Sequence, residues 1–122
     1  MKIQSYKELI VWQKSILLTK MIYSTTEIFP KAEIFGLTSQ IRRAAVSIPS
    51  NIAEGFSRKH RKEYRQFLLI AFGSAAEMET QLIIGHELKF VKDDEFNELR
   101  SLLEEVRKML HKMISTLSQE IS

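Results

Sequence analysis

The fold of this chain is decided by residues 93–117, which read DDEFNELRSLLEEVRKMLHKMISTL. Apolar residues recur here at alternating spacings of three and four: Phe96, Leu99, Leu103, Val106, Leu110, Met113 and Leu117. This period places one apolar stripe along a helix and is typical of helices in antiparallel bundles. The acidic start, Asp93–Glu95, and Lys108 and Lys112 near the end complement the helix dipole.

Three segments upstream show helical patterns of their own. We expect helices at about Ser5–Ile28, from Leu37 to Gly55, and at about Arg61–Leu88. The second contains Pro49, which removes a backbone donor and clashes with the carbonyl group of Ala45. We therefore expect a kink or a break there.

The links between these helices are short, namely Phe29–Gly36, Phe56–His60 and Lys89–Lys92. Short links between long helices force neighbouring helices to run antiparallel. No segment shows the alternation of a strand, and 122 residues fit one domain. The sequence therefore predicts an all-α fold, an antiparallel up-down-up-down four-helix bundle, with residues 1–122 as a single domain.

Local details of these helices give further expectations. Ser5 and Glu8 have the spacing of a capping box at the start of the first helix. We expect Leu9, Trp12, Ile16 and Tyr23 to lie on one side of this helix, with a second apolar set beside them. Gly55 suits a helix end. The small residues of Gly73–Ala76 suit close helix packing, since Gly costs stability in a helix interior.

The first and last helices carry more apolar residues than one bundle seam needs. The surplus residues are Ile10, Leu17, Met21 and Ile28 in the first helix and Leu102, Met109 and Ile114 in the last. Two interpretations remain open. The bundle has a thick core, or a second face is buried between subunits, because large exposed apolar patches usually mark interfaces.

Several classes of function lack their motifs. The chain has no Cys, no phosphate-binding loop and no Gly-x-Ser-x-Gly elbow. His60, His86 and His111 are not preceded at three residues by Glu, as a di-iron bundle requires. We therefore expect no enzyme activity, no metal and no cofactor. The first residues lack the apolar core of a signal peptide, and no uninterrupted apolar run could span a membrane, so we expect a cytoplasmic protein.

Positive charge is concentrated in one stretch. The whole chain carries a net charge of +3. Residues 42–65 alone carry +5, from seven Lys or Arg against two Glu, whereas the rest carries −2. Such a concentration is typical of a surface that faces an anion.

The strongest local signal is residues 58–65, which read RKHRKEYR. Cations at a helix start oppose the helix dipole, so helix stability does not explain them. The candidate nucleic-acid-binding residues are Arg58, Lys59, Arg61, Lys62 and Arg65, with Arg42 a further member. Tyr64 could stack on a base. The other interpretation is a solvated charged turn. Of the adjacent Arg42 and Arg43, we assign the structural role to Arg43, paired with Glu54 or Glu77.

Three stretches resemble one family. They are residues 9–14 (LIVWQK), 35–55 (FGLTSQIRRAAVSIPSNIAEG) and 73–82 (GSAAEMETQL). Together they resemble the four-helix-bundle proteins encoded within 23S rRNA intervening sequences. The resemblance implies a bundle that assembles into a ring, with a pentamer expected. It also implies similarity to the accessory proteins of diversity-generating retroelements, which form such a ring and bind nucleic acid and a reverse transcriptase. This chain departs from the family at His60, where Ser or Thr is usual.

Three hypotheses about function follow. The first is a non-enzymatic oligomer that binds nucleic acid, with structured RNA as the ligand. Five phosphate contacts on a single strand would give a salt slope near −3.5. The second is a scaffold that binds a partner protein. The third is a structural ring with no nucleic-acid ligand.

Overall fold

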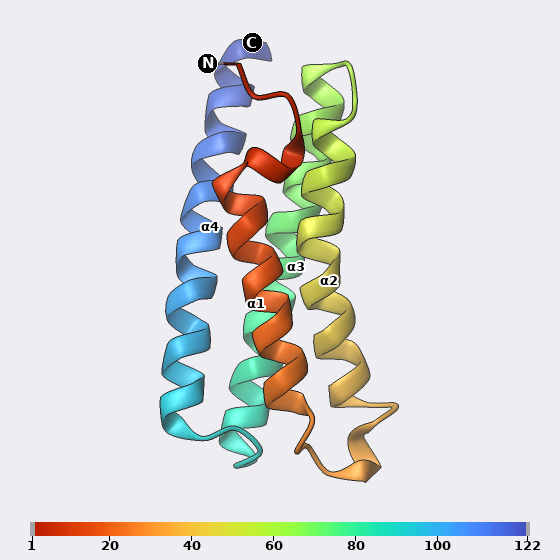
Figure 1. The fold of residues 1–122 in the computed structure, drawn as a ribbon, viewed down its shortest axis with the longest axis vertical. Coiled ribbons are helices and arrows are strands. Elements are labelled where there is room, and N and C mark those ends of the chain that lie inside the picture. Colours follow the sequence, from red (N-terminus) through yellow and green to blue (C-terminus); the bar gives the residue numbers. More distant parts are fainter. Residues whose placement is uncertain (1, 122) are drawn as a thin grey trace.

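The computed structural model describes residues 2–121, and these residues form four long helices (Figure 1). The helices are α1 (Ile10–Thr26), α2 (Leu37–Phe56), α3 (Arg61–Glu87) and α4 (Asp93–Ile121), with two short 3-10 turns, η1 (Tyr6–Glu8) and η2 (Lys31–Glu33). No strand occurs in this described part of the chain. Successive helices run in opposite directions, which confirms the expected all-α, up-down-up-down bundle.

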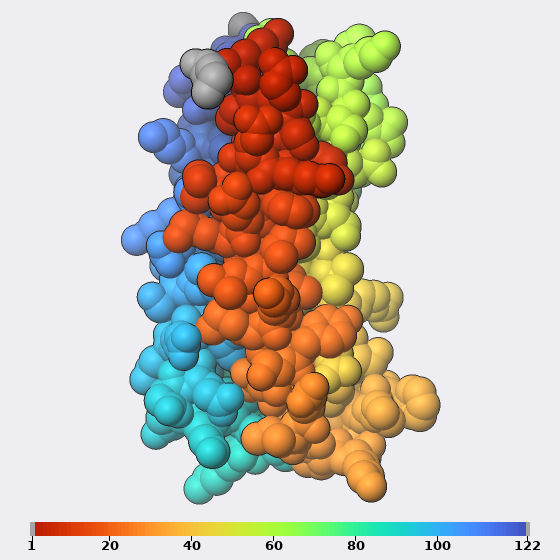
Figure 2. All heavy atoms as spheres, viewed as in Figure 1, coloured from red at the N-terminus to blue at the C-terminus, as the bar shows by residue number. Residues whose placement is uncertain are grey.

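Each helix packs against two others. α2 contacts α1 and α3, and α4 contacts α1 and α3, so the bundle is a closed square. The α2–α3 turn and both chain termini lie at one end, which we call the α2–α3 end. The α1–α2 link and the α3–α4 turn lie at the other, the α3–α4 end. Figure 2 shows the α1–α2 link, in orange, projecting from the surface there.

The core confirms the apolar stripes predicted for α2 and α4. Both helices contribute side chains that are at most 1% exposed, namely Ile41, Ala44, Ile48, Ile52, Leu99, Leu103, Val106 and Leu110. From α3, Leu68, Ala71, Ala75, Met78 and Leu82 complete the interior. The surplus apolar residues of the last and the first helix differ in burial. In α4, Leu102 is buried and Met109 and Ile114 pack against the core. In α1, Ile10 and Leu17 are 52% and 50% exposed.

The first helix differs from its prediction. The capping box of Ser5 and Glu8 is present, but it caps η1. Leu9 is extended, with φ −72° and ψ 124°, so α1 begins only at Ile10 and ends at Thr26. Of the four residues predicted to lie on one side, Leu9 and Trp12 pack against the core, whereas Tyr23 is exposed. The buried apolar residues of α1 are Val11, Leu18 and Ile22.

Pro49 lies inside α2, which runs without a break from Leu37 to Phe56, so the alternative of a break at Pro49 was wrong. Gly55 lies in the last turn of α2, where a Cβ atom would be 2.8 Å from the Cβ atom of Phe67 on α3. Its role is close helix approach. Gly73 has no such role, because a Cβ atom there would meet nothing within 4 Å.

Helix α3 is long and apolar enough to cross a membrane by length and composition alone, with a mean hydropathy of 1.4 over its most apolar window. The expectation that no segment could span a membrane is therefore not met by composition alone. A core helix of a water-soluble protein passes the same test. α3 packs against α2 and α4 and supplies buried side chains to their shared core, with 33% of its apolar window buried, so we assign it to the bundle as one of its four helices.

Candidate nucleic-acid interface

The turn between α2 and α3 is tight because Gly55 lets α3 approach closely. Only residues 57–60 separate the two helices. The backbone amides of Ser57 and Arg58 donate to the carbonyl oxygens of Ala53 and Gly55 at 3.1 Å each. α3 begins at Arg61 as predicted, and no side chain caps it, because His60 makes no capping hydrogen bond. The turn therefore presents its side chains outward.

We call residues 58–62 the basic turn, and all five side chains are exposed. Lys59 and Lys62 have no ion pair or hydrogen bond to any described residue. Arg58 lies between two carboxylates, with its Nε atom 3.5 Å from Glu54 and its NH1 atom 3.7 Å from Glu63. These long, exposed pairs are weak. The two lysines are therefore the free cations of the turn.

The end of α4 supplies partners that the sequence analysis did not identify. The Nε atom of Arg61 lies 3.1 Å from a carboxylate oxygen of Glu120. The Nε atom of Arg65 donates to the hydroxyl of Ser118 at 2.7 Å, and Arg65 is half-buried. Arg65 thus links α3 to α4. No local signal could reveal these contacts, since the partners lie more than fifty residues along the chain.

Tyr64 also faces inward. Its ring packs edge-on against Phe56, with ring centroids 6.1 Å apart, and its Cδ1 atom lies close to Gly55. Burial raises the pKa of the Tyr64 phenol above its ordinary value of 10.0. The predicted stacking role on a base is thus replaced by packing between α2 and α3.

A hollow of about 460 Å³ lies beside the basic turn. It is lined by Lys59, His60, Arg61, Lys62, Glu120 and Ile121. The five candidate cations of this end face three carboxylates, those of Glu54, Glu63 and Glu120, so a net charge of +2 remains. The surface can attract a phosphate chain, but less strongly than the sequence alone indicates.

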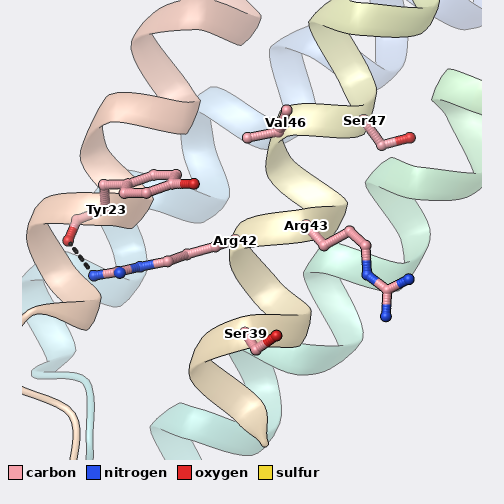
Figure 3. Close-up of a pocket in the computed structure, with 6 residues that line it drawn as sticks. All are labelled: Tyr23, Ser39, Arg42, Arg43, Val46 and Ser47. Atoms are coloured by element: carbon pink, nitrogen blue, oxygen red, sulfur yellow. Dashed lines mark hydrogen bonds between the residues drawn. The ribbon is translucent and has the colours of Figure 1, made fainter. Parts of the chain in front are cut away.

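Arg42 lies apart from the basic turn. Its Nε atom donates to the hydroxyl of Thr26 at 2.8 Å, and its NH2 group donates to the carbonyl oxygen of Tyr23 at 3.3 Å (Figure 3). Its guanidinium carbon is 4.6 Å from the centre of the Tyr23 ring. Arg42 therefore joins α2 to α1.

Arg43 has the opposite surroundings, so the assignment of the structural role to Arg43 was wrong. Figure 3 shows its side chain pointing away from Arg42, toward α3. It is exposed and pairs with no described residue, neither with Glu54 nor with Glu77. Adjacent residues on a helix point in different directions, so the rotation of α2 about its axis decides that Arg42, and not Arg43, faces α1.

The groove between α1 and α2 is the second cationic surface. It measures about 530 Å³ and is lined by Tyr23, Ser39, Arg42, Arg43, Val46 and Ser47 (Figure 3). None of these side chains is acidic. Across residues 2–121, no group of three or more His, Cys, Asp or Glu side chains could hold a metal ion. The candidate site therefore offers cations and an aromatic ring, the chemistry that nucleic acids and other anions bind.

Comparison with protein families matches residues 7–112 to the 23S rRNA-intervening sequence protein. The chain belongs to this family. The match covers the α2–α3 turn and most of all four helices.

One solved structure similar to this member of the 23S rRNA-intervening sequence family is a protein of unknown function from the S23 ribosomal protein family of Bacteroides thetaiotaomicron VPI-5482. It aligns with a TM-score of 0.78 at 23% identity, over 86% of this chain and 98% of the other. At that identity the likeness establishes the fold alone. No curated protein sequence matches the chain significantly.

Proposed function

We propose that this chain is a non-enzymatic, RNA-binding protein of the cytoplasm that acts as an oligomer. The basic turn carries the proposal. Lys59 and Lys62 are exposed and unpaired, and they border a hollow of about 460 Å³. The family description names an intervening sequence of 23S rRNA, which motivates the choice of RNA as the nucleic acid to test first.

The arrangement suggests an order of contacts. The two lysines meet phosphates first, because no carboxylate must be displaced from them. Arg58 and Arg61 then exchange exposed carboxylate partners for phosphate oxygens, at little cost in exposed ion pairs. Arg65 and Arg42 already make hydrogen bonds within the bundle and are expected to contribute least.

A salt-dependent binding titration tests this proposal. Fluorescence anisotropy with a labelled single-stranded RNA should give an affinity that falls steeply with salt. The double variant Lys59→Ala/Lys62→Ala should bind more weakly, with a salt slope smaller by about 1.4. The matched control is Lys31→Ala/Lys89→Ala, which removes the same charge at the α3–α4 end. Binding that ignores salt, or equal losses in both variants, would refute the proposal.

Oligomerisation is the second part of the proposal. Ile10 and Leu17 are about half exposed on α1, which suits a surface covered by another copy. A pentameric ring, as the family resemblance implies, would repeat the basic turn five times and strengthen binding by avidity. Light scattering should give a mass near five times 14.2 kDa. A monomer mass at micromolar concentration would rule it out.

A protein scaffold is the other candidate function, and one observation favours it. Apolar side chains are exposed at the α3–α4 end, among them Ile28, Ile34, Leu88 and Phe35, which is 93% exposed. A pull-down that recovers one defined protein after nuclease treatment, and loses it with Phe35→Ser, would support this function. A ring that binds neither RNA nor protein would leave the purely structural role.

A further inference from the structure

A further pocket lies between α2 and α3, away from the basic turn. It measures about 260 Å³ and is lined by Gln40, Arg43, Ser47, Glu77 and Gln81. All five side chains are polar. Arg43 and Ser47 also line the α1–α2 groove, so α2 forms the ridge between the two hollows. We call this hollow the α2–α3 pocket.

Four of the five side chains that line the α2–α3 pocket lack partners among the described residues, and one of them, Gln40, is exposed at the surface. The guanidinium of Arg43 and the carboxylate of Glu77 make no hydrogen bond or ion pair, even with each other. Gln81 is only 7% exposed, and its Oε1 atom is fully buried without a donor. Buried polar atoms nearly always make hydrogen bonds, so the side-chain amide of Gln81 would gain one from a ligand that offers a donor.

Ser47 is the lining residue whose side chain is already satisfied. The hydroxyl of Ser47 lies 2.8 Å from that of Ser74, and it accepts from the side-chain amide of Asn51 at 2.9 Å. These hydrogen bonds connect α2 to α3 beside the pocket. The charged groups without partners are Arg43 on α2 and Glu77 on α3, and the terminal amide torsion of Gln81 has a broad range of allowed angles.

We propose that the α2–α3 pocket binds a guanine base. Guanine presents two N–H donors, N1 and N2, on one edge and two acceptors, O6 and N7, on another. A carboxylate matches the first edge, and an arginine fork matches the second. Adenine has an acceptor at N1 and an amino group in place of O6, so it keeps at most one hydrogen bond on each edge and matches neither edge with a pair. Glu77 reads the donor edge, Arg43 reads the acceptor edge, and the amide of Gln81 turns to meet the base.

The placement suits a base drawn out of a single strand. Arg43 lies about 20 Å from Phe56, the last residue of α2, at about 1.5 Å per residue, and the basic turn begins two residues further on. Stacked nucleotides are about 3.4 Å apart, so about seven nucleotides join the pocket to the basic turn. Sequence-specific RNA recognition commonly uses such extruded bases. The inference that the guanine belongs to an RNA rests on the proposed function, in which the basic turn binds the RNA backbone without recognising its sequence.

The test compares labelled RNAs of about twenty nucleotides on the full chain, all uridine except for one central base, so that either flank is long enough to reach the basic turn. Wild type should bind the guanine RNA about fivefold or more tighter than the adenine RNA. Inosine lacks the N2 amino group and 7-deazaguanine lacks N7, so each should lose part of the preference. Glu77→Gln should bind guanine and inosine equally and leave affinity for all-uridine RNA unchanged. Glu87→Gln, the same change on exposed α3 surface, should behave as wild type.

Free guanosine monophosphate separates the pocket from the basic turn. It should shift the side-chain amide signals of Gln81 in an NMR titration, whereas adenosine monophosphate should not. If all-uridine RNA binds but guanine brings no gain, the inference is overturned and the proposed function stands. If no RNA binds, the proposed function fails, and the titration with free guanosine monophosphate still decides whether the α2–α3 pocket binds guanine. Unchanged Gln81 signals would overturn the inference.

Discussion

The hydroxyl of Thr19 on α1 lies 3.1 Å from the backbone carbonyl oxygen of Ala45 on α2. This carbonyl would normally accept the amide of the residue four positions later, which is Pro49 and has no N–H group. Thr19 also lies 2.8 Å from the carbonyl oxygen of Ser15. The single hydroxyl proton of Thr19 is shared between these two carbonyl oxygens, so a side chain of α1 donates in part to the acceptor that proline leaves open, and α2 continues without a break.

Thr19→Val should therefore destabilise the bundle by about 1 kcal/mol, the usual contribution of one hydrogen bond. Urea unfolding followed by circular dichroism measures this change. Thr19→Ser keeps the hydroxyl and should cost less. The cost of Thr19→Val should shrink when it is combined with Pro49→Ala, which restores an amide donor to Ala45. Costs that add without coupling would contradict this role of Thr19.

Much of the fold could be predicted because α2 and α4 carry unbroken apolar stripes. The first helix could be predicted as a helix, but its buried face could not, because polar residues occupy part of that face. Ser15 is fully buried, and its hydroxyl donates to the carbonyl oxygen of Trp12 at 2.7 Å. The hydroxyl of Thr26 donates to the carbonyl oxygen of Ile22 in the same way. Such bonds to the helix's own backbone satisfy a buried hydroxyl, so polarity in the sequence does not mark the outer side of this helix.

The candidate site was predictable in position but not in detail. The run of cations at residues 58–62 and the tight turn are visible in the sequence. The partners of Arg61 and Arg65 come from Glu120 and Ser118 at the far end of the chain, which no local pattern reveals. The roles of Arg42 and Arg43 depend on the rotation of α2 about its axis, which a stripe of period 3.6 defines only coarsely.

Gly55 and Gly73 should respond oppositely to the same substitution. In Gly55→Ala, the new Cβ atom would lie 2.8 Å from the Cβ atom of Phe67 and 3.0 Å from the ring of Tyr64. Such crowding should destabilise by about 1–3 kcal/mol. In Gly73→Ala, nothing lies within 4 Å, so the higher helix propensity of Ala should stabilise by about 1 kcal/mol. Urea unfolding of both variants measures the difference, and a shared sign would contradict the packing described.

Lys89 lies two residues after the end of α3 and has a left-handed backbone conformation. Its φ is 66°, and the amide of Phe90 donates to the carbonyl oxygen of Gly85 at 2.8 Å. Gly adopts this left-handed conformation without steric cost. Lys89→Gly should therefore raise the free energy of unfolding by about 1 kcal/mol. Lys89→Ala removes the same charge but keeps the Cβ atom, so it should bring little gain. Equal stabilisation by both variants would point to charge as the cause.

The ionisation of Tyr64 should make stability depend on alkaline pH. Burial raises the pKa of its phenol in the folded chain above 10.0, so the unfolded chain loses this proton first as pH rises. The folded chain then binds more protons than the unfolded chain, and the free energy of unfolding falls above about pH 10. Tyr64→Phe cannot ionise and should lose stability less steeply there. All lysines and the other tyrosines are common to both proteins, so the difference between their urea-unfolding profiles isolates Tyr64. Parallel profiles from neutral to alkaline pH would show that its phenol ionises alike in both states.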